Sequence, residues 1–186
     1  RGLGDVYKRQ DEDAVNKLHQ WNNSNYWSLS FTDAHDLTQS NDSSLNCSIK
    51  SSLKSRMDIS KRFVLIVGNS TDKVTAGSCT LCGSYNSHTY ACARSYSVDK
   101  RSFIKYECDK AVEAGIKVIV LYKSAKIEKS KCPDAVKDVG VHATMCYRGE
   151  DGKLYWDYQS VKAAFDASDN SCLLYTSPSP RDPKTS

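Results

Sequence analysis

Two short apolar runs constrain the fold of this chain more than any other feature of its sequence. Residues 62–67 read RFVLIV and residues 117–122 read KVIVLY. Continuous apolar runs of this length, rich in β-branched residues, are typical of strands that are buried on both faces of a parallel sheet. Such a sheet needs helices to cover both faces, so the two runs predict an α/β fold.

Helical and strand patterns alternate around these two runs. Apolar residues recur at helical spacing in four segments, and a glycine follows the third of them as a helix-ending residue. The expected helices cover Asp11–Trp21, Leu45–Met57, Arg101–Ala114 and Ser160–Ala167. The further expected strands are Tyr26–Phe31, Val139–Met145 and Leu154–Tyr158, the last of them preceded by a turn at Gly149–Gly152.

The two ends of the chain are predicted to be translated sequencing adapter rather than protein. The first ten residues, RGLGDVYKRQ, can be back-translated so that the reverse complement, in a shifted frame, encodes CLLYTSPSPR, which is Cys172–Arg181. Residues 1–10 and 171–186 are therefore set apart from the fold. The domain is expected to span residues 11–170, with an insertion at residues 69–99.

Setting the ends apart changes the charge and the cysteine count. Five basic and two acidic residues are removed, so the formal net charge falls from +4 to +1. The composition then gives no support for a nucleic-acid or anionic-membrane partner. No apolar run reaches the roughly 18 residues of a membrane span, and no signal peptide is visible. The seven remaining cysteines, an odd number, favour reduced thiols or a metal site in a cytoplasmic protein.

The domain is expected to have a truncated first strand. In a flavodoxin-like sheet that strand lies in the middle, and ligands bind beside it at the carboxyl ends of the strands. The first expected element here is instead the helix that begins at Asp11. Asp11 and Asp33 follow expected strand positions near that edge, and Gly68 ends a strand, so all three are candidate ligand-binding residues. Each acid could equally be a helix cap or a turn residue.

The helix expected at Arg101–Ala114 carries the best candidate for a catalytic group. Glu107 lies on the flank of the stripe that is expected to be buried. That stripe consists of Ile104, Cys108, Ala111, Val112 and Gly115. A carboxylate in this position can be partly desolvated at the rim of the sheet. The alternative is an ordinary surface acid at the boundary of a helix.

Together the FVLIVG strand, the FIKYECDKAVEAG helix and the KVIVLY strand resemble TIR-like domains, in particular the TIR-like ThsB proteins of bacterial Thoeris antiphage defence. The resemblance covers most of Asp11–Phe165. Such families place a catalytic glutamate on this helix, and the matching residue is Glu107. The resemblance implies that NAD, as substrate, is processed to an ADP-ribose-derived nucleotide that activates a separate effector. It also implies a homo-oligomer formed through TIR-like surfaces.

The implied chemistry suits a single carboxylate. Cleavage of the nicotinamide–ribose bond develops oxocarbenium character on the ribose, which a nearby carboxylate can stabilise. The nicotinamide of NAD leaves without needing a proton, so no second acid is required. Phe103 could stack on a base of the substrate or pack in the core. The competing hypothesis is a non-catalytic flavodoxin-like module that senses a nucleotide or binds a partner protein, with Glu107 as a surface residue.

The insertion contains a group of candidate metal ligands. Cys79 and Cys82 form a C-x2-C pair, and His88 and Cys92 follow within ten residues. Two thiolates on a tight turn, a third thiolate and an imidazole could form a Cys3His site for a structural zinc ion. The spacing matches no standard zinc finger, and reduced thiols without a metal are the alternative. A long loop with little apolar content would be stabilised by such a metal.

Overall fold

The computed structural model describes residues 3–27, 29, 31 and 45–170 of the chain. The helices are α1 (Leu3–Asn22), α2 (Asn46–Ile59), α3 (Phe103–Glu113) and α4 (Tyr158–Asn170). The strands are β1 (Arg62–Val67), β2 (Tyr85–Asn86), β3 (Ala91–Cys92), β4 (Lys117–Tyr122), β5 (Val141–Thr144), β6 (Cys146–Arg148) and β7 (Leu154–Trp156). Short 3₁₀ turns lie at η2 (Thr71–Lys73), η3 (Cys79–Leu81), η4 (Lys129–Lys131) and η5 (Asp134–Val136).

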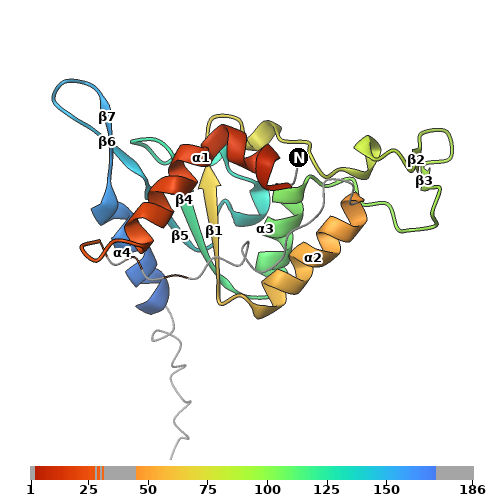
Figure 1. Ribbon diagram of the computed structural model, residues 1–186, viewed down its shortest axis with the longest axis horizontal. Helices are drawn as coiled ribbons and strands as arrows, with labels where there is room; N and C mark the ends of the chain where they lie inside the picture. The colour runs from red at the N-terminus through yellow and green to blue at the C-terminus, as the bar shows by residue number, and fades with distance from the viewer. Residues whose placement is uncertain (1–2, 28, 30, 32–44, 171–186) are drawn as a thin grey trace, which may run out of the picture.

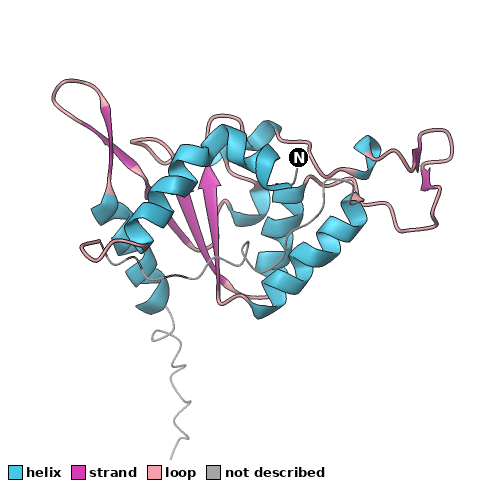
Figure 2. Cartoon of the chain, viewed as in Figure 1, coloured by secondary structure: helices cyan, strands magenta, loops and turns pink. Residues whose placement is uncertain are grey.

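A parallel sheet in the order β1-β4-β5 forms the centre of the fold (Figure 2). The two apolar runs pair with each other along their whole length, from Arg62 opposite Lys117 to Val67 opposite Tyr122. The predicted pair of buried parallel strands, and with it the α/β class, is therefore confirmed. Two small antiparallel hairpins, β2–β3 and β6–β7, project at opposite ends of the molecule in Figure 1.

Helices cover both faces of the sheet, as expected for a doubly covered parallel sheet (Figure 1). Side chains of β4 alternate between the two layers because successive residues of a strand point to opposite faces. Ile119 and Leu121 pack with α1 and α4, whereas Val118 and Val120 pack with α2 and α3. All four are buried, which explains why the run shows no polar alternation.

The segment Tyr26–Phe31 was expected to be a strand, and this expectation is wrong for its described residues. Asn25–Trp27 form a turn, and neither Leu29 nor Phe31 belongs to a strand. The side-chain amide of Asn22 forms hydrogen bonds with both backbone groups of Phe31. It accepts a hydrogen bond from the N–H at 2.7 Å and donates one to the C=O at 2.9 Å. The alternating apolar residues instead pack against the layer formed by α1 and α4, where Trp27 contacts the ring of Tyr158.

The edge of β1 away from β4 has no strand partner among the described residues. The predicted truncation of the first strand of the sheet stays a prediction. α1 is interrupted at Asp11, whose φ of −134° and ψ of 24° are not helical. The interruption coincides with the expected start of the domain, although the assignment of residues 1–10 and 171–186 to adapter also stays a prediction.

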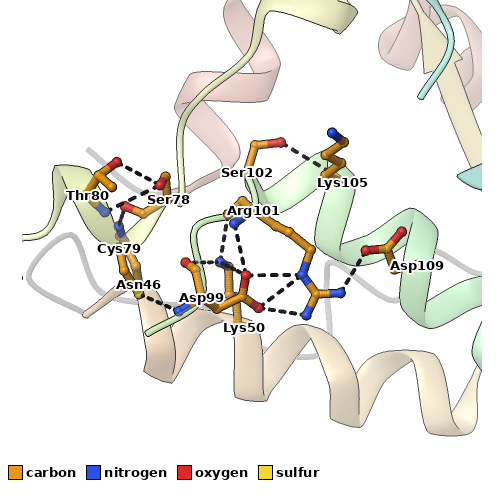
Figure 3. A network of polar contacts seen from close by, with 10 residues as sticks. All are labelled: Asn46, Lys50, Ser78, Cys79, Thr80, Asp99, Arg101, Ser102, Lys105 and Asp109. Atoms are coloured by element: carbon orange, nitrogen blue, oxygen red, sulfur yellow. Dashed lines mark hydrogen bonds and ion pairs between the residues drawn. The ribbon is translucent and has the colours of Figure 1, made fainter. Parts of the chain in front are cut away.

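A polar network fixes the base of the insertion to α2 and α3 (Figure 3). The Nζ of Lys50 is only 3.3 Å from a carboxylate oxygen of Asp99, and it donates to the backbone carbonyls of Asp99 and Arg101. Arg101 in turn bridges Asp99 and Asp109, each at 2.7 Å. Lys50 is only 4% exposed, so its charge depends on these partners.

This network predicts a dependence of stability on pH. Burial acts to raise the pKa of Asp99, but hydrogen bonds from Arg101 and the charge of Lys50 outweigh it and lower that pKa to about 2. A depressed pKa stabilises the fold above the usual carboxyl range, and this contribution is lost as the pH falls towards 2. We expect Asp99→Asn to cost about 2 kcal/mol of unfolding free energy at pH 6 and much less near pH 2.5. Urea unfolding of both proteins at the two pH values measures the difference, and a difference that does not change with pH would contradict the prediction.

Candidate functional site

A groove of about 640 Å³ runs beside the open edge of β1. Figure 1 shows β1 between α1 and α2, and both helices contribute to the groove. Its apolar lining includes Val15 and Leu18 from α1, Leu53 and Met57 from α2, and Phe63 and Ile66 from β1. Phe63 and Ile66 point to opposite faces of the sheet, so the groove extends around the edge of the strand. A cavity of this size is within the range that binds small organic ligands.

Glu107 lies on the wall of this groove and is half-buried. The helix that carries it begins at Ser102, whose hydroxyl accepts a hydrogen bond from the backbone N–H of Lys105 as an N-cap. Ile104 and Cys108 are buried against the sheet, which fixes the rotation of α3 about its axis. Val112, expected in the same buried stripe, is instead 39% exposed, because it lies near the end of the helix at the margin of the stripe. Glu107 therefore projects from the flank of the buried stripe, where the sequence pattern placed it.

Three cationic side chains line one end of the groove. Arg56 lies at the end of α2, Lys61 in the connection, and Arg62 at the start of β1. Arg62 forms an ion pair with Asp169 and lies 5.1 Å from the centre of the Phe165 ring. The groove thus combines apolar walls, one carboxylate and a cationic end. That set of groups can take a ligand with a planar apolar part and an anionic part.

Two other predicted residues, Asp11 of α1 and Gly68 after β1, lie next to each other at the carboxyl end of β1. A Cβ on Gly68 would lie 2.3 Å from a carboxylate oxygen of Asp11, so a side chain at this position would have to displace that carboxylate. Lys123 reaches Asp11 at 3.6 Å and Asp13 at 2.5 Å. Burial raises the pKa of Asp11, and the charge of Lys123 opposes this shift. The chain's own carboxylate therefore fills the space beside Gly68.

The predicted ligand-binding residues are not brought to one place. Neither Asp11 nor Gly68 lines the groove that contains Glu107. Phe103 is 5% exposed and packs with Ile49, so it serves the core, the second of its two expected roles. Asp33 lies outside the described residues.

Three of the four predicted metal ligands lie together. Cys79, Cys82 and Cys92 line a single small pocket, and Cys47 from the first turn of α2 is a fourth thiol in its wall. His88 does not line this pocket; it is exposed in the turn between β2 and β3, where its N–H donates to the side chain of Asn86. In the described part of the chain, no group of three or more His, Cys, Asp or Glu side chains is arranged so that it could hold a metal ion.

Sequence reasoning missed two parts of these sites. The cationic end of the groove comes from Arg56, Lys61 and Arg62, and their clustering around the start of β1 was the available signal. Cys47 had no partner at motif spacing, because 32 residues separate it from Cys79. Only the packing of α2 against the base of the insertion brings the two together.

The parallel sheet β1-β4-β5 with helices on both faces is consistent with a TIR-like or flavodoxin-like α/β fold. A family model of the Thoeris protein ThsB, TIR-like domain, matches residues 6–76. Over these residues the match supports a TIR-like domain of the Thoeris ThsB family, and it supports a role in antiphage defence in general. No curated protein and no solved structure matches the chain.

The matched residues include α2, β1 and most of the groove lining, whereas Glu107 lies beyond them. No helix in the described part of the chain combines the length and the apolar character that crossing a membrane requires.

Proposed function

We propose that this domain binds NAD in the groove beside β1 and cleaves it to an ADP-ribose-derived signalling nucleotide, with Glu107 as the catalytic carboxylate. The observation that carries this proposal is the position of Glu107, half-buried on the wall of a groove of about 640 Å³. The match to the ThsB TIR-like family supports the defence role in which such a signal would act. A cytoplasmic location, where NAD is available, is part of the same proposal.

The groups around the groove suit the parts of this substrate. The apolar walls can receive the nicotinamide ring, and the carboxylate of Glu107 can stabilise the positive charge that develops on the ribose as the ring leaves. The pyrophosphate carries negative charge, which Arg56, Lys61 and Arg62 in the lining of the groove can pair with. The proposal needs no resident cofactor.

The intact chain tests this proposal in cells. Bacteria that express the full chain are challenged with phage, and nicotinamide and ADP-ribose-derived products are followed by mass spectrometry. The proposal expects these products to rise above those of cells that lack the chain. If the purified chain binds NAD but no product forms in challenged cells, the non-catalytic nucleotide-sensing alternative is favoured. If the chain neither binds nor cleaves NAD, both nucleotide functions are contradicted.

The cationic end of the groove makes a separate prediction about binding. Lys61 is exposed and lines the groove, so Lys61→Glu replaces an attractive charge with a repulsive one beside the expected pyrophosphate. We expect about tenfold weaker NAD binding, equivalent to about 1.4 kcal/mol. Titration calorimetry measures it. Lys73→Glu makes the same charge change at an exposed residue outside the groove, and equal weakening by both variants would refute a local effect.

A further inference from the structure

We propose that Cys47, Cys79, Cys82 and Cys92 bind a structural zinc ion that staples the insertion to α2. The four thiols line one pocket, and no disulfide joins any of them. The cavity holds about 10 Å³, which is room for one ion or one water molecule and too small for an organic ligand. The inference is independent of the proposed NAD chemistry, because none of these cysteines lines the groove.

The fold brings these thiols together from three different elements. Cys47 lies in the first turn of α2, and the side chain of its neighbour Asn46 donates to the carbonyl of Ser78 at 2.9 Å. This bond places the start of α2 beside Cys79, the first residue of η3. The backbone N–H of Cys82 donates to the carbonyl of Cys79 at 3.0 Å, which makes the tight turn of a C-x2-C pair.

The hairpin of the insertion supplies the fourth thiol. Cys92 in β3 pairs with Tyr85 in β2, and the N–H of Tyr85 donates to the carbonyl of Cys82 at 2.9 Å. The hairpin is therefore bonded directly to the turn that carries Cys82. Its register puts Cys92 on the wall of the same pocket, whereas His88 lies at the far turn of the hairpin.

Cys79 already has the surroundings of a ligand. It is buried, and its sulfur accepts a hydrogen bond from the backbone N–H of Asp99 at 3.3 Å. The same two residues are joined a second time, because the N–H of Cys79 donates to the carbonyl of Asp99 at 3.0 Å. N–H groups that point at sulfur stabilise a thiolate, the form that binds metal. The Lys50 network holds Asp99 in this position (Figure 3).

The insertion needs such a staple because it buries little apolar surface. Residues 79–98 add no side chain to any of the three hydrophobic clusters. Leu81, Tyr90 and Tyr96 are all more than half exposed. Ordering a segment of this length costs conformational entropy, and here little hydrophobic burial offsets that cost. Metal binding can supply the free energy that stabilises the ordered segment.

Four soft thiolates suit zinc in a tetrahedral site, in which the metal would lie about 2.3 Å from each sulfur. The four cysteines line one pocket, but their side chains as they lie in the structure are not arranged to hold an ion. Loss of the thiol protons on metal binding would draw them in. The remaining described cysteines have another role: Cys108, Cys132 and Cys146 are buried in the two main hydrophobic clusters.

The test uses the full chain purified under reducing conditions. We expect one zinc ion per chain by elemental analysis and a Co²⁺-substituted form with the absorption of a tetrahedral tetrathiolate site. Cys47→Ser should lose its zinc during dialysis against a chelator, whereas His88→Ala and Cys146→Ser should keep theirs. Retention of zinc by Cys47→Ser, or its loss from His88→Ala, would overturn the assignment of Cys47 in place of His88.

A measurement on the unsubstituted chain decides the ligand set even if Cys47→Ser fails to fold. X-ray absorption of the zinc-bound chain should show four sulfur ligands at about 2.3 Å and no nitrogen ligand. A site with three sulfurs and one nitrogen would overturn the four-cysteine assignment. Failure of the reduced chain to bind Zn²⁺ or Co²⁺, or mass-spectrometric detection of disulfides among these four cysteines in protein from the cytoplasm, would overturn the metal site altogether.

Discussion

Replacing Glu107 with glutamine is expected to reduce formation of NAD-derived product by at least about 100-fold, the effect of removing one group that stabilises charge in a transition state. Glutamine keeps the size of the side chain, so the groove keeps its shape, and only the negative charge is lost. The charge is worth most here because Glu107 is half-buried beside apolar walls. Mass spectrometry of product in phage-challenged cells that express the full-length variant measures the effect.

Glu113→Gln is the matched control for this experiment. Glu113 lies on the same helix, but it is exposed, forms an ion pair with Lys110 and does not line the groove. We expect this variant to make as much product as the unsubstituted chain. If Glu107→Gln has an unchanged melting temperature and retains product within about threefold of the control, Glu107 is not the group that stabilises the transition state.

The position of the groove changes the expectation about where a ligand binds. In open α/β sheets, ligands gather at the carboxyl ends of the strands, and that rule selected Asp11 and Gly68 from the sequence. The carboxylate of Asp11 lies against Gly68 itself, so the chain fills that space. The larger opening lies along the side of β1, where one edge of the sheet has no strand partner in the described residues. Glu107 reaches this opening because α3 packs beside α2.

The elements that the sequence predicted well are those whose pattern is local. The runs at Arg62–Val67 and Lys117–Tyr122 became β1 and β4 with the expected bounds, because a strand buried on both faces needs apolar residues at every position. The end of α3 was also predicted, since a glycine directly after a helical pattern is a common helix-ending residue, and Gly115 does adopt a positive φ of 65°. The rotation of α3 followed from the same stripe, which is why Glu107 could be placed.

The features that the sequence did not predict depend on contacts between distant segments. Phe31 does not lie in a strand because Asn22 satisfies its backbone, and no alternation of apolar residues carries that information. Cys47 joins the thiols of the insertion only through the docking of α2. His88 lies between the cysteines in the sequence but at the exposed turn of a hairpin in the structure, because order along the chain does not fix the direction of a side chain.

Replacing Lys50 with methionine is expected to lower the free energy of unfolding by about 3 kcal/mol, the effect of removing one member of a buried ion pair. Methionine keeps the length and the apolar stem but removes the charge. Asp99 then loses one of its cationic partners, and the carbonyls of Asp99 and Arg101 lose their donor. The Nζ also lies 5.6 Å from the centre of the Tyr106 ring, a contact that methionine replaces only partly. Urea unfolding of the full chain measures the change.

Lys54→Met provides the control, because Lys54 is an exposed lysine one turn further along α2. We expect it to change the free energy of unfolding by less than about 0.5 kcal/mol. A double variant, Lys50→Met with Asp99→Asn, should cost less than the sum of the two single changes, since each variant removes the same ion pair. If the costs add, or if Lys50→Met resembles Lys54→Met, the ion pair does not hold the insertion to α2.

Zinc retention by Lys50→Met separates the contribution of the ion pair from that of the four cysteines. If the cysteines bind the metal independently of the ion pair, the variant keeps its zinc. If the geometry of Cys79 depends on Asp99, the variant binds zinc more weakly.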